Sequence, residues 1–190
     1  MRPCSFISVL VAAVFAAGCD SALAPPNQPQ LHASYDANIG QSAGITGGGQ
    51  YSLSGLPAKF SVSAIRHPDG AATGEFRQFL DEGGGVVVDF HASVTCMAVD
   101  PVNHRGWIAG VITENRSTDP DFLTPIQQPG QDIWFRVLDG GDGGGDRLTF
   151  TGFQGSAGIQ TSAEYCETQP WPADNARTWP VTAGNISVRP

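Results

Sequence analysis

The sequence predicts an all-β domain over residues 46–190, built as an antiparallel meander of about eight strands closed into a β-barrel, with a two-sheet β-sandwich as the alternative. Short runs of alternating apolar and polar residues, rich in β-branched and aromatic side chains, are typical of half-buried strands. Glycine or proline interrupts the domain roughly every eight to twelve residues, which is the spacing of turns between short strands. We recognise no capped amphipathic helix.

The clearest element is a predicted hairpin in residues 132–153, DIWFRVLDGGDGGGDRLTFTGF. Ile133, Phe135 and Val137 share one face of its first strand, and the second strand covers residues 148–151. The glycine-rich run between them cannot continue a strand cheaply and supplies any positive φ that the reversal needs.

Other runs with the same alternation predict six further strands. In the longest of them, Val94 and Cys96 fall on the apolar face, so we expect Cys96 to point into the core. Two long segments, residues 114–131 and 164–184, lack the alternation and are predicted to be loops, which are often functional. The six strands are expected at residues 49–53, 59–67, 72–80, 86–99, 105–113 and 185–189.

The N-terminus has the features of an export signal. Arg2 precedes an apolar run at residues 6–17, and the segment ends in Ala-Ala-Gly-Cys, which resembles the bacterial lipobox. The resemblance implies a lipoprotein signal peptide at residues 1–18 and a lipid on Cys19, whereas an ordinary secretory signal is the alternative. Residues 19–45 are polar and proline-rich and are predicted to tether the domain to the membrane. We therefore expect an extracytoplasmic location in the bacterial cell envelope, at the inner or the outer membrane.

The charge of the chain limits its possible binding partners, and its cysteine content indicates how the thiols are used. With 10 Lys and Arg against 18 Asp and Glu, the net charge of −8 argues against nucleic-acid binding, which needs a basic surface. The membrane, reached through the lipid, is the expected partner, and a protein or glycan partner stays open. Cys4 leaves with the signal and Cys19 carries the lipid, so Cys96 and Cys166 remain as a disulfide pair in an oxidising compartment, or as two free buried thiols.

The order of motifs in the mature chain resembles a widespread, mostly uncharacterised family of secreted bacterial β-domains. GGG precedes the first strand, VTCMAV and GWIAGVI follow, and GNISV closes the chain after the acidic glycine turn. The family tends to have a DNGEG…D turn, where this chain has GGDGGG, and its members commonly carry the two cysteines that match Cys96 and Cys166. The resemblance implies the β-fold but no activity. A shorter likeness to the first strands of avidin-like barrels lacks their pattern of ligand-binding residues.

Two groups of residues are candidate sites. Asp139, Asp142 and Asp146 surround the glycine turn, and carboxylates on such a loop can bind calcium weakly. Without the spacing of a known calcium motif, a solvated acidic turn is the simpler interpretation, and no other cofactor is expected. Trp171 and Trp179 lie among prolines, and could form a surface for a ligand or partner or could cover the core beneath a loop.

Asp89, His91 and Ser93 share one face of a predicted strand, which offers an acid, a base and a nucleophile in a row. Side chains on one strand face stand about 6.5–7 Å apart, too far for a hydrogen-bonded relay, so we assign no catalytic residue. The four histidines lack zinc spacing. We expect a non-catalytic binding or structural module. A barrel holding a small apolar ligand is the alternative, and a hydrolase is the third hypothesis.

Overall fold

The computed structural model describes residues 42–141 and 145–190. The predicted signal peptide, Cys19, nearly all of the predicted tether and Asp142 lie outside these residues. No helix in the described part of the chain is long and apolar enough to cross a bilayer. The strands are β1 (Ala43–Leu53), β2 (Leu56–Arg66), β3 (Ala72–Gly83), β4 (Val86–Asp100), β5 (Arg105–Asn115), β6 (Asp132–Leu138), β7 (Arg147–Leu148), β8 (Gly152–Phe153) and β9 (Trp179–Arg189).

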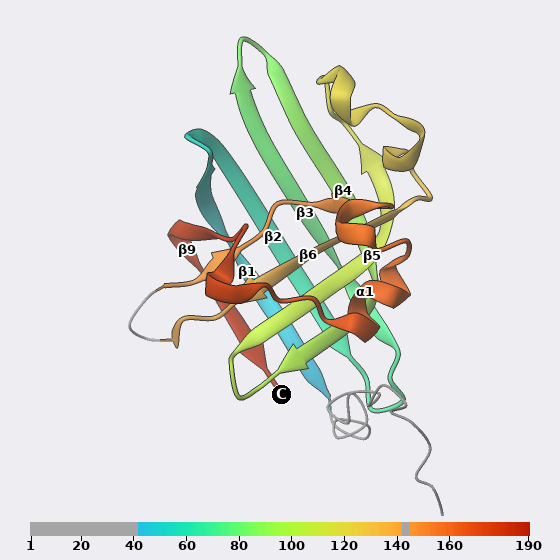
Figure 1. The fold of residues 1–190 in the computed structure, drawn as a ribbon, viewed down its shortest axis with the longest axis vertical. Helices are drawn as coiled ribbons and strands as arrows, with labels where there is room; N and C mark the ends of the chain where they lie inside the picture. The colour runs from blue at the N-terminus through green and yellow to red at the C-terminus, as the bar shows by residue number, and fades with distance from the viewer. Residues whose placement is uncertain (1–41, 142–144) are drawn as a thin grey trace, which may run out of the picture. The chain divides into compact units, whose positions relative to one another are not determined.

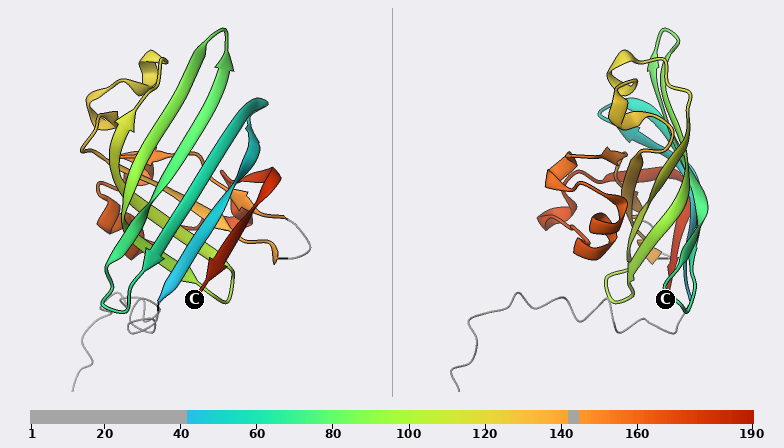
Figure 2. Two further views of the ribbon diagram at one scale, coloured as in Figure 1. Left: turned by 180° about the vertical axis from the view of Figure 1, so that it is seen from behind. Right: turned by 90° about the vertical axis from the view of Figure 1, so that its right-hand side faces the viewer.

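Eight of these strands close into an antiparallel β-barrel. The sheet runs β5-β4-β3-β2-β1-β9-β7-β6, and the additional pairing of β5 with β6 joins its two ends. The ninth strand, β8, pairs only with β6. Figure 1 shows the long meander β1 to β5, and Figure 2 shows the helical segments gathered on one side of the sheet. The predicted barrel is therefore confirmed, and closure leaves its strands few free edges.

The first and the last strand begin well before their predicted starts. The first strand, β1, begins at Ala43, so the last residues assigned to the tether belong to the barrel, and Ile45 is fully buried there. The last strand, β9, begins at Trp179 rather than at Asn185, inside the predicted second loop. In both places glycine or proline interrupts the alternation, so the local pattern did not predict a strand. Pairing of β1 with β2, and of β9 with β1 and β7, stabilises the strands there.

Aromatic rings meet inside the barrel. The ring centroids of Phe76 and Phe135 are 4.9 Å apart, and those of Phe90 and Phe153 are 5.0 Å apart. Gln78 is the one amide among the fully buried side chains, and it accepts a hydrogen bond from the Tyr51 hydroxyl at 2.7 Å. Its own amide donates to the Thr149 carbonyl at 3.1 Å, which satisfies both ends of the group.

A β-bulge reverses the alternation along β4 and overturns the predicted direction of Cys96. Val94 pairs with Gly110, but the next pair joins Cys96 to Ala109, so one extra residue enters β4. As a result Met97 joins the barrel core, whereas Cys96 packs on the outer wall. A bulge shifts every later side chain to the opposite face, and no residue type in this run signalled it.

One helix was missed by the sequence prediction. The segment between β8 and β9 contains α1 (Ser162–Thr168), in the region expected to be a loop. Its N-cap is Thr161, whose Oγ1 accepts a hydrogen bond from the backbone N–H of Glu164 at 3.1 Å. The Glu164 carboxylate in turn accepts from the backbone N–H of Gln160. Short single-turn helices complete this segment and the 114–131 loop, at Pro120–Phe122, Pro125–Gln127, Ser156–Gly158 and Ala173–Asn175.

The strands β1 and β9 approach each other very closely. A Cβ on Gly49 would lie 2.1 Å from the Ala183 carbonyl oxygen, and one on Gly184 would lie 2.1 Å from the Gly48 oxygen. Gly184 also has φ of 109°. Backbone proximity therefore requires glycine at positions 49 and 184, since no other residue lacks a Cβ.

Candidate functional site

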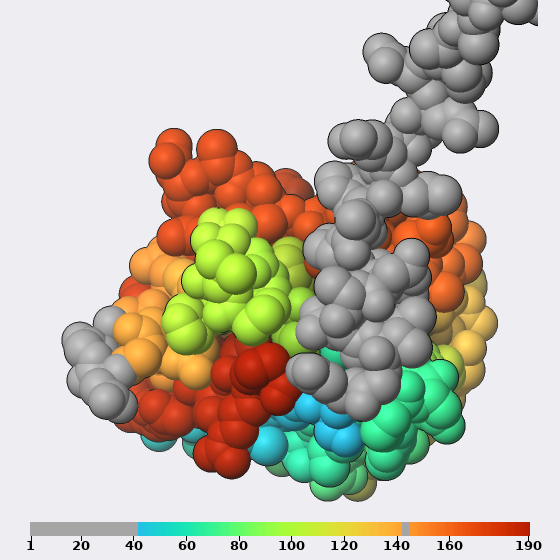
Figure 3. All heavy atoms as spheres, turned by 90° about the horizontal axis from the view of Figure 1, so that it is seen from below, coloured from blue at the N-terminus to red at the C-terminus, as the bar shows by residue number. Residues whose placement is uncertain are grey.

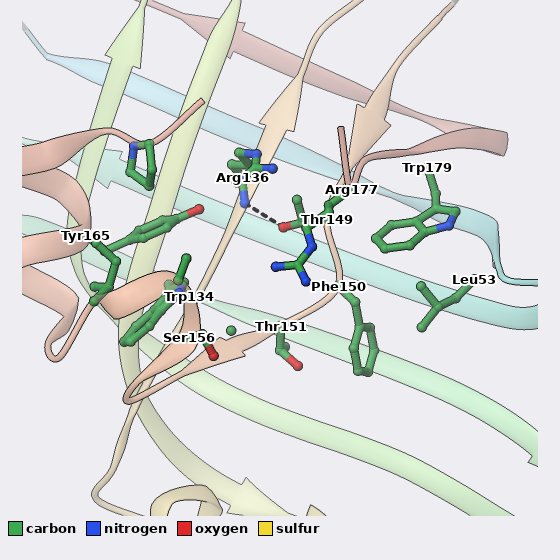
Figure 4. A pocket seen from close by; sticks show the side chains of 14 residues that line it. Leu53, Trp134, Arg136, Thr149, Phe150, Thr151, Ser156, Tyr165, Arg177 and Trp179 are labelled. Atoms are coloured by element: carbon green, nitrogen blue, oxygen red, sulfur yellow. Dashed lines mark hydrogen bonds between the residues drawn. The ribbon is translucent and has the colours of Figure 1, made fainter. Parts of the chain in front are cut away.

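A pocket of about 340 Å³ lies between β6 and the segment that connects it to β9, where outward-facing Trp134 meets Leu53, Phe150 and Trp179, which pack against the barrel core. We call it the side pocket. Figure 4 shows its side chains converging from β1, β6, the residues that follow β7, and α1. Its lining consists of Leu53, Trp134, Arg136, Thr149, Phe150, Thr151, Gly152, Ser156, Ala157, Ile159, Tyr165, Pro170, Arg177 and Trp179.

Trp134 and Tyr165 form a flat wall of the side pocket. Their ring centroids are 5.5 Å apart with an interplanar angle of 20°, and both residues are buried. Gly152 pairs with Trp134 across β6 and β8, and a Cβ there would lie 2.3 Å from the Trp134 Nε1. Only glycine lets the chain cross so close to the indole edge.

Arg136 is a buried cation in the same wall. The residue is 9% exposed, and burial lowers the pKa of its guanidinium. Its Nη2 donates to the Ala176 carbonyl oxygen at 2.9 Å, and its Cζ lies 5.4 Å from the centre of the Trp171 ring. Its Nε is buried and has no hydrogen-bond partner. The Thr151 hydroxyl, also in the lining, is a second buried polar group without a partner.

Arg177 brings a second positive charge. Figure 4 shows its guanidinium reaching into the space between the Trp134–Tyr165 wall and the side of Phe150 and Trp179. Arg177 has φ of 61°, and Asn175, two residues earlier, has φ of 52°. Left-handed backbone is costly for residues other than glycine, and such strain tends to persist where surrounding contacts enforce it.

The segment carrying α1 is fixed to the barrel by covalent and polar contacts. Cys96 and Cys166 form the predicted disulfide and are 70 positions apart in sequence. The Ser162 hydroxyl donates to the Gly110 carbonyl at 2.7 Å, and the Ser162 N–H donates to the Asp132 carboxylate at 3.1 Å. The apolar layer under α1, which we call the outer layer, is separate from the barrel core and consists of Ala98, Trp107, Ala109, Trp134, Ile159, Tyr165 and Cys166.

The two predicted surface tryptophans have different surroundings. Trp179 is half-buried and lines the side pocket. Trp171 lies outside that lining, packs edge-on against Trp107 with centroids 5.6 Å apart, and donates its indole N–H to Asn175. Trp171 is therefore a support for Arg136, whereas Trp179 is placed to touch a ligand.

The two described aspartates of the glycine turn accept backbone hydrogen bonds. Asp146 is buried and accepts the N–H of Gly140 at 2.8 Å and that of Ile186 at 2.7 Å. Asp139 accepts from Gly141 at 2.8 Å and from Val188 at 3.0 Å. No group of three possible metal ligands occurs among the described residues, and the third candidate, Asp142, is not one of them.

The carboxylates of Asp139 and Asp146 connect the glycine turn to β9 through hydrogen bonds with Val188 and Ile186. We call these contacts the seam between β7 and β9. Because β7 has two residues, its ladder with β9 ends at Pro180, and the later N–H groups of β9 that point away from β1 have no strand to pair with on that side. The carboxylates accept two of those N–H groups. In Figure 3 the turn between β4 and β5 lies beside the end of β9, and its His104 carbonyl accepts the Asp139 N–H.

The row of Asp89, His91 and Ser93 is organised around an ion pair. Arg77 donates to both Asp89 carboxylate oxygens, at 2.8 and 2.7 Å, and this hydrogen bonding raises the pKa of the guanidinium. The His91 Nε2 lies 3.5 Å from Asp89 and has no hydrogen-bond partner. Ser93 is exposed opposite Glu75, and the described residues contain no hydrogen bond between Ser93 and His91. The three side chains thus form no relay in this arrangement.

Sequence reasoning missed Trp134, Arg136, Tyr165 and Arg177 as members of a site. One signal was present, because Trp134 alternates with Ile133 and Phe135 and must therefore face away from the barrel core. A tryptophan on the outer face of a strand requires a cover. The identity of that cover depended on the fold of a segment that was read as a loop.

Comparison of the chain with protein-family models found no match, and comparisons with curated proteins and with solved structures found no significant match.

Proposed function

We propose that this chain is a lipid-anchored, extracytoplasmic β-barrel of the bacterial cell envelope that acts as a non-catalytic binding module, with the side pocket as its binding site. The pocket itself carries the proposal. It combines about 340 Å³ of space, aromatic walls and a few unpartnered polar groups, and these are the usual features of a small-molecule site.

The contents of the barrel favour the side pocket over a site inside the barrel. Phe76, Phe90, Phe135 and Phe153 are buried and in ring contact across the interior. A small apolar ligand in the barrel would have to displace these rings, and losing such packing costs several kcal/mol. The side pocket needs no such rearrangement.

The proposed location rests on the chemistry of three cysteines and on the resemblance. The Ala-Ala-Gly-Cys sequence that ends at Cys19 supports lipid attachment. The disulfide between Cys96 and Cys166 supports an oxidising compartment, since such bonds are rare in the cytosol. The resemblance to secreted bacterial β-domains points in the same direction.

A fragment screen by ligand-observed NMR tests the proposed site. We expect several aromatic fragments to bind, and Trp179→Ala to abolish their signals because it removes one wall. The matched control is Phe79→Ala, which removes another half-buried aromatic ring that does not line the side pocket. Fragments that bind equally to both variants, or no binding fragments at all, would show that the side pocket is not a binding site.

A further inference from the structure

We propose that the side pocket selects a small organic anion, a carboxylate carried on a flat aromatic or unsaturated body. This inference rests on the proposed function, because it names the class of ligand for the same pocket. Three features carry it: the charge balance of the lining, its unpartnered donors and the shape of its walls.

The charge balance is one-sided. Among the described residues that line the pocket, the charged ones are Arg136 and Arg177, and both are cationic. The chain as a whole has a net charge of −8, so carboxylates are plentiful elsewhere and yet none lines this pocket. A buried cation without an anionic partner is costly, and a bound carboxylate removes that cost.

The donors are arranged for an acceptor that the protein does not supply. Arg136 uses Nη2 for the Ala176 carbonyl, while its Nε is buried and free of any partner. The Thr151 hydroxyl is buried and free as well. A guanidinium presents its N–H groups in a planar fork that matches a carboxylate, and such charge-assisted hydrogen bonds are the strong ones.

The second cation is held in place by its neighbours. The strained backbone at Arg177 is followed by Thr178, whose hydroxyl donates to the Asn175 carbonyl at 2.6 Å. Arg147 donates to both the hydroxyl and the carbonyl of Thr178 at 2.8 Å. These contacts fix the turn from which the Arg177 guanidinium reaches into the pocket in Figure 4.

The walls favour a flat body. Trp134 stacks on Tyr165 on one side, while Phe150 and Trp179 lie on the other. A volume of about 340 Å³ is at the small end of ligand sites, which suits one or two fused rings. Aromatic faces gain stacking energy from a planar ligand that an aliphatic chain cannot match.

Arg105 provides a matched control for a purely structural role. Its guanidinium lies over the same Trp171 ring, 4.6 Å from the centre, and its Nε is likewise buried without a partner. Arg105, however, does not line the side pocket. If these arginines serve only to pack against Trp171, Arg105→Gln and Arg136→Gln will behave alike.

The test uses isothermal titration calorimetry with two probes of one shape, 1-naphthoate and neutral 1-naphthalenemethanol, and with inorganic phosphate. The full chain carries Cys19→Ser, so that no attached lipid absorbs the apolar probes. We expect naphthoate to bind at least about tenfold more tightly than the alcohol, the smallest gain expected from one charge-assisted hydrogen bond. Chemical-shift changes at the Trp134 and Trp179 indole N–H groups place the probe in the pocket.

The variants identify the groups responsible. We expect Arg177→Gln and Arg136→Gln each to weaken naphthoate binding by about tenfold or more and to leave binding of the alcohol unchanged. Arg105→Gln is expected to change neither by more than about twofold. Because Arg177 is exposed, its variant keeps the test decisive even if Arg136→Gln fails to fold.

The outcomes separate this inference from the proposed function. If the alcohol binds as tightly as the acid with the same shift changes, the pocket binds ligands but does not select anions, and the inference is wrong. If phosphate binds as tightly as naphthoate, the inferred preference for a flat body is wrong. If neither probe binds and the fragment screen is also blank, the proposed function fails together with the inference.

Discussion

Replacing Asp146 by Asn should destabilise the barrel at its seam. The carboxylate is buried and accepts two backbone N–H groups, from Gly140 at 2.8 Å and from Ile186 at 2.7 Å. Hydrogen bonds to a charged group contribute about 1.5–3 kcal/mol each. An amide keeps one oxygen as a neutral acceptor and turns its NH₂ group toward the other N–H, so we expect a loss of about 2–4 kcal/mol. For a domain of this size that loss lowers Tm by roughly 5–15 °C.

Thermal unfolding followed by circular dichroism measures this loss, with and without millimolar calcium. Asp142→Asn is the control, because it removes a charge from the same glycine turn and should change stability by less than about 0.5 kcal/mol. An unchanged Tm in Asp146→Asn would refute the role of the seam. A large rise in Tm with calcium, abolished by Asp146→Asn, would show instead that the turn is a metal site.

Three further predictions concern backbone contact, the disulfide and the anchor. Gly49→Ala should lower the free energy of unfolding, measured by chemical denaturation, by about 3 kcal/mol, because its Cβ would lie 2.1 Å from a carbonyl oxygen. Gly44→Ala is the control and should be nearly neutral, because its Cβ would lie 3.8 Å from its nearest neighbour. Thiol titration of the unfolded, unreduced domain should detect neither Cys96 nor Cys166, and two reactive thiols would contradict the disulfide. Because the two cysteines are 70 positions apart, loss of their bond should lower the free energy of unfolding by about 4 kcal/mol. Cys19→Ser should move the protein from the detergent phase to the aqueous phase, and equal partitioning of both forms would exclude a lipid anchor.

The barrel was predictable because most of its strands carry alternation that a local reading detects. In β2 the buried residues Phe60, Val62 and Ala64 alternate with exposed neighbours, as a strand with one face in the core requires. The prediction failed where a local pattern was broken by a tertiary device. The bulge before Cys96 is such a device, since it depends on how β4 pairs with β5 and on no distinctive residue in β4.

The second strand of the predicted hairpin shows another limit. Its alternation extends through Thr151, but β7 ends at Leu148. There the Thr149 hydroxyl accepts the backbone N–H of Arg136 at 3.1 Å, while the Thr149 N–H donates to the Arg136 carbonyl. A side chain thus replaces one ladder acceptor, and the chain leaves the sheet before it returns as β8. Threonine is common in strands, so the presence of Thr149 did not indicate that the strand ends there.

The helix α1 had a readable signal, because Thr161 and Glu164 have the spacing of a capping box. With only seven residues, α1 has too little periodicity to be detected by hydrophobic pattern alone. Isolated helices of this length are marginal in water, so its stability must come from the disulfide of Cys166 and the packing of Tyr165 on Trp134.

The same bulge also shapes the outer wall on which α1 packs. Before it, β4 turns polar residues such as Asp89 to the outside; after it, Cys96 and Ala98 face outward instead. An outer wall with small and apolar side chains can bury a second layer, and the disulfide fixes α1 on that wall. The outer layer in turn excludes water from Arg136. Without that layer the outer face of β6 would face solvent, and the guanidinium would be hydrated. A one-residue insertion in β4 thereby provides part of the surface on which the cover of Arg136 packs.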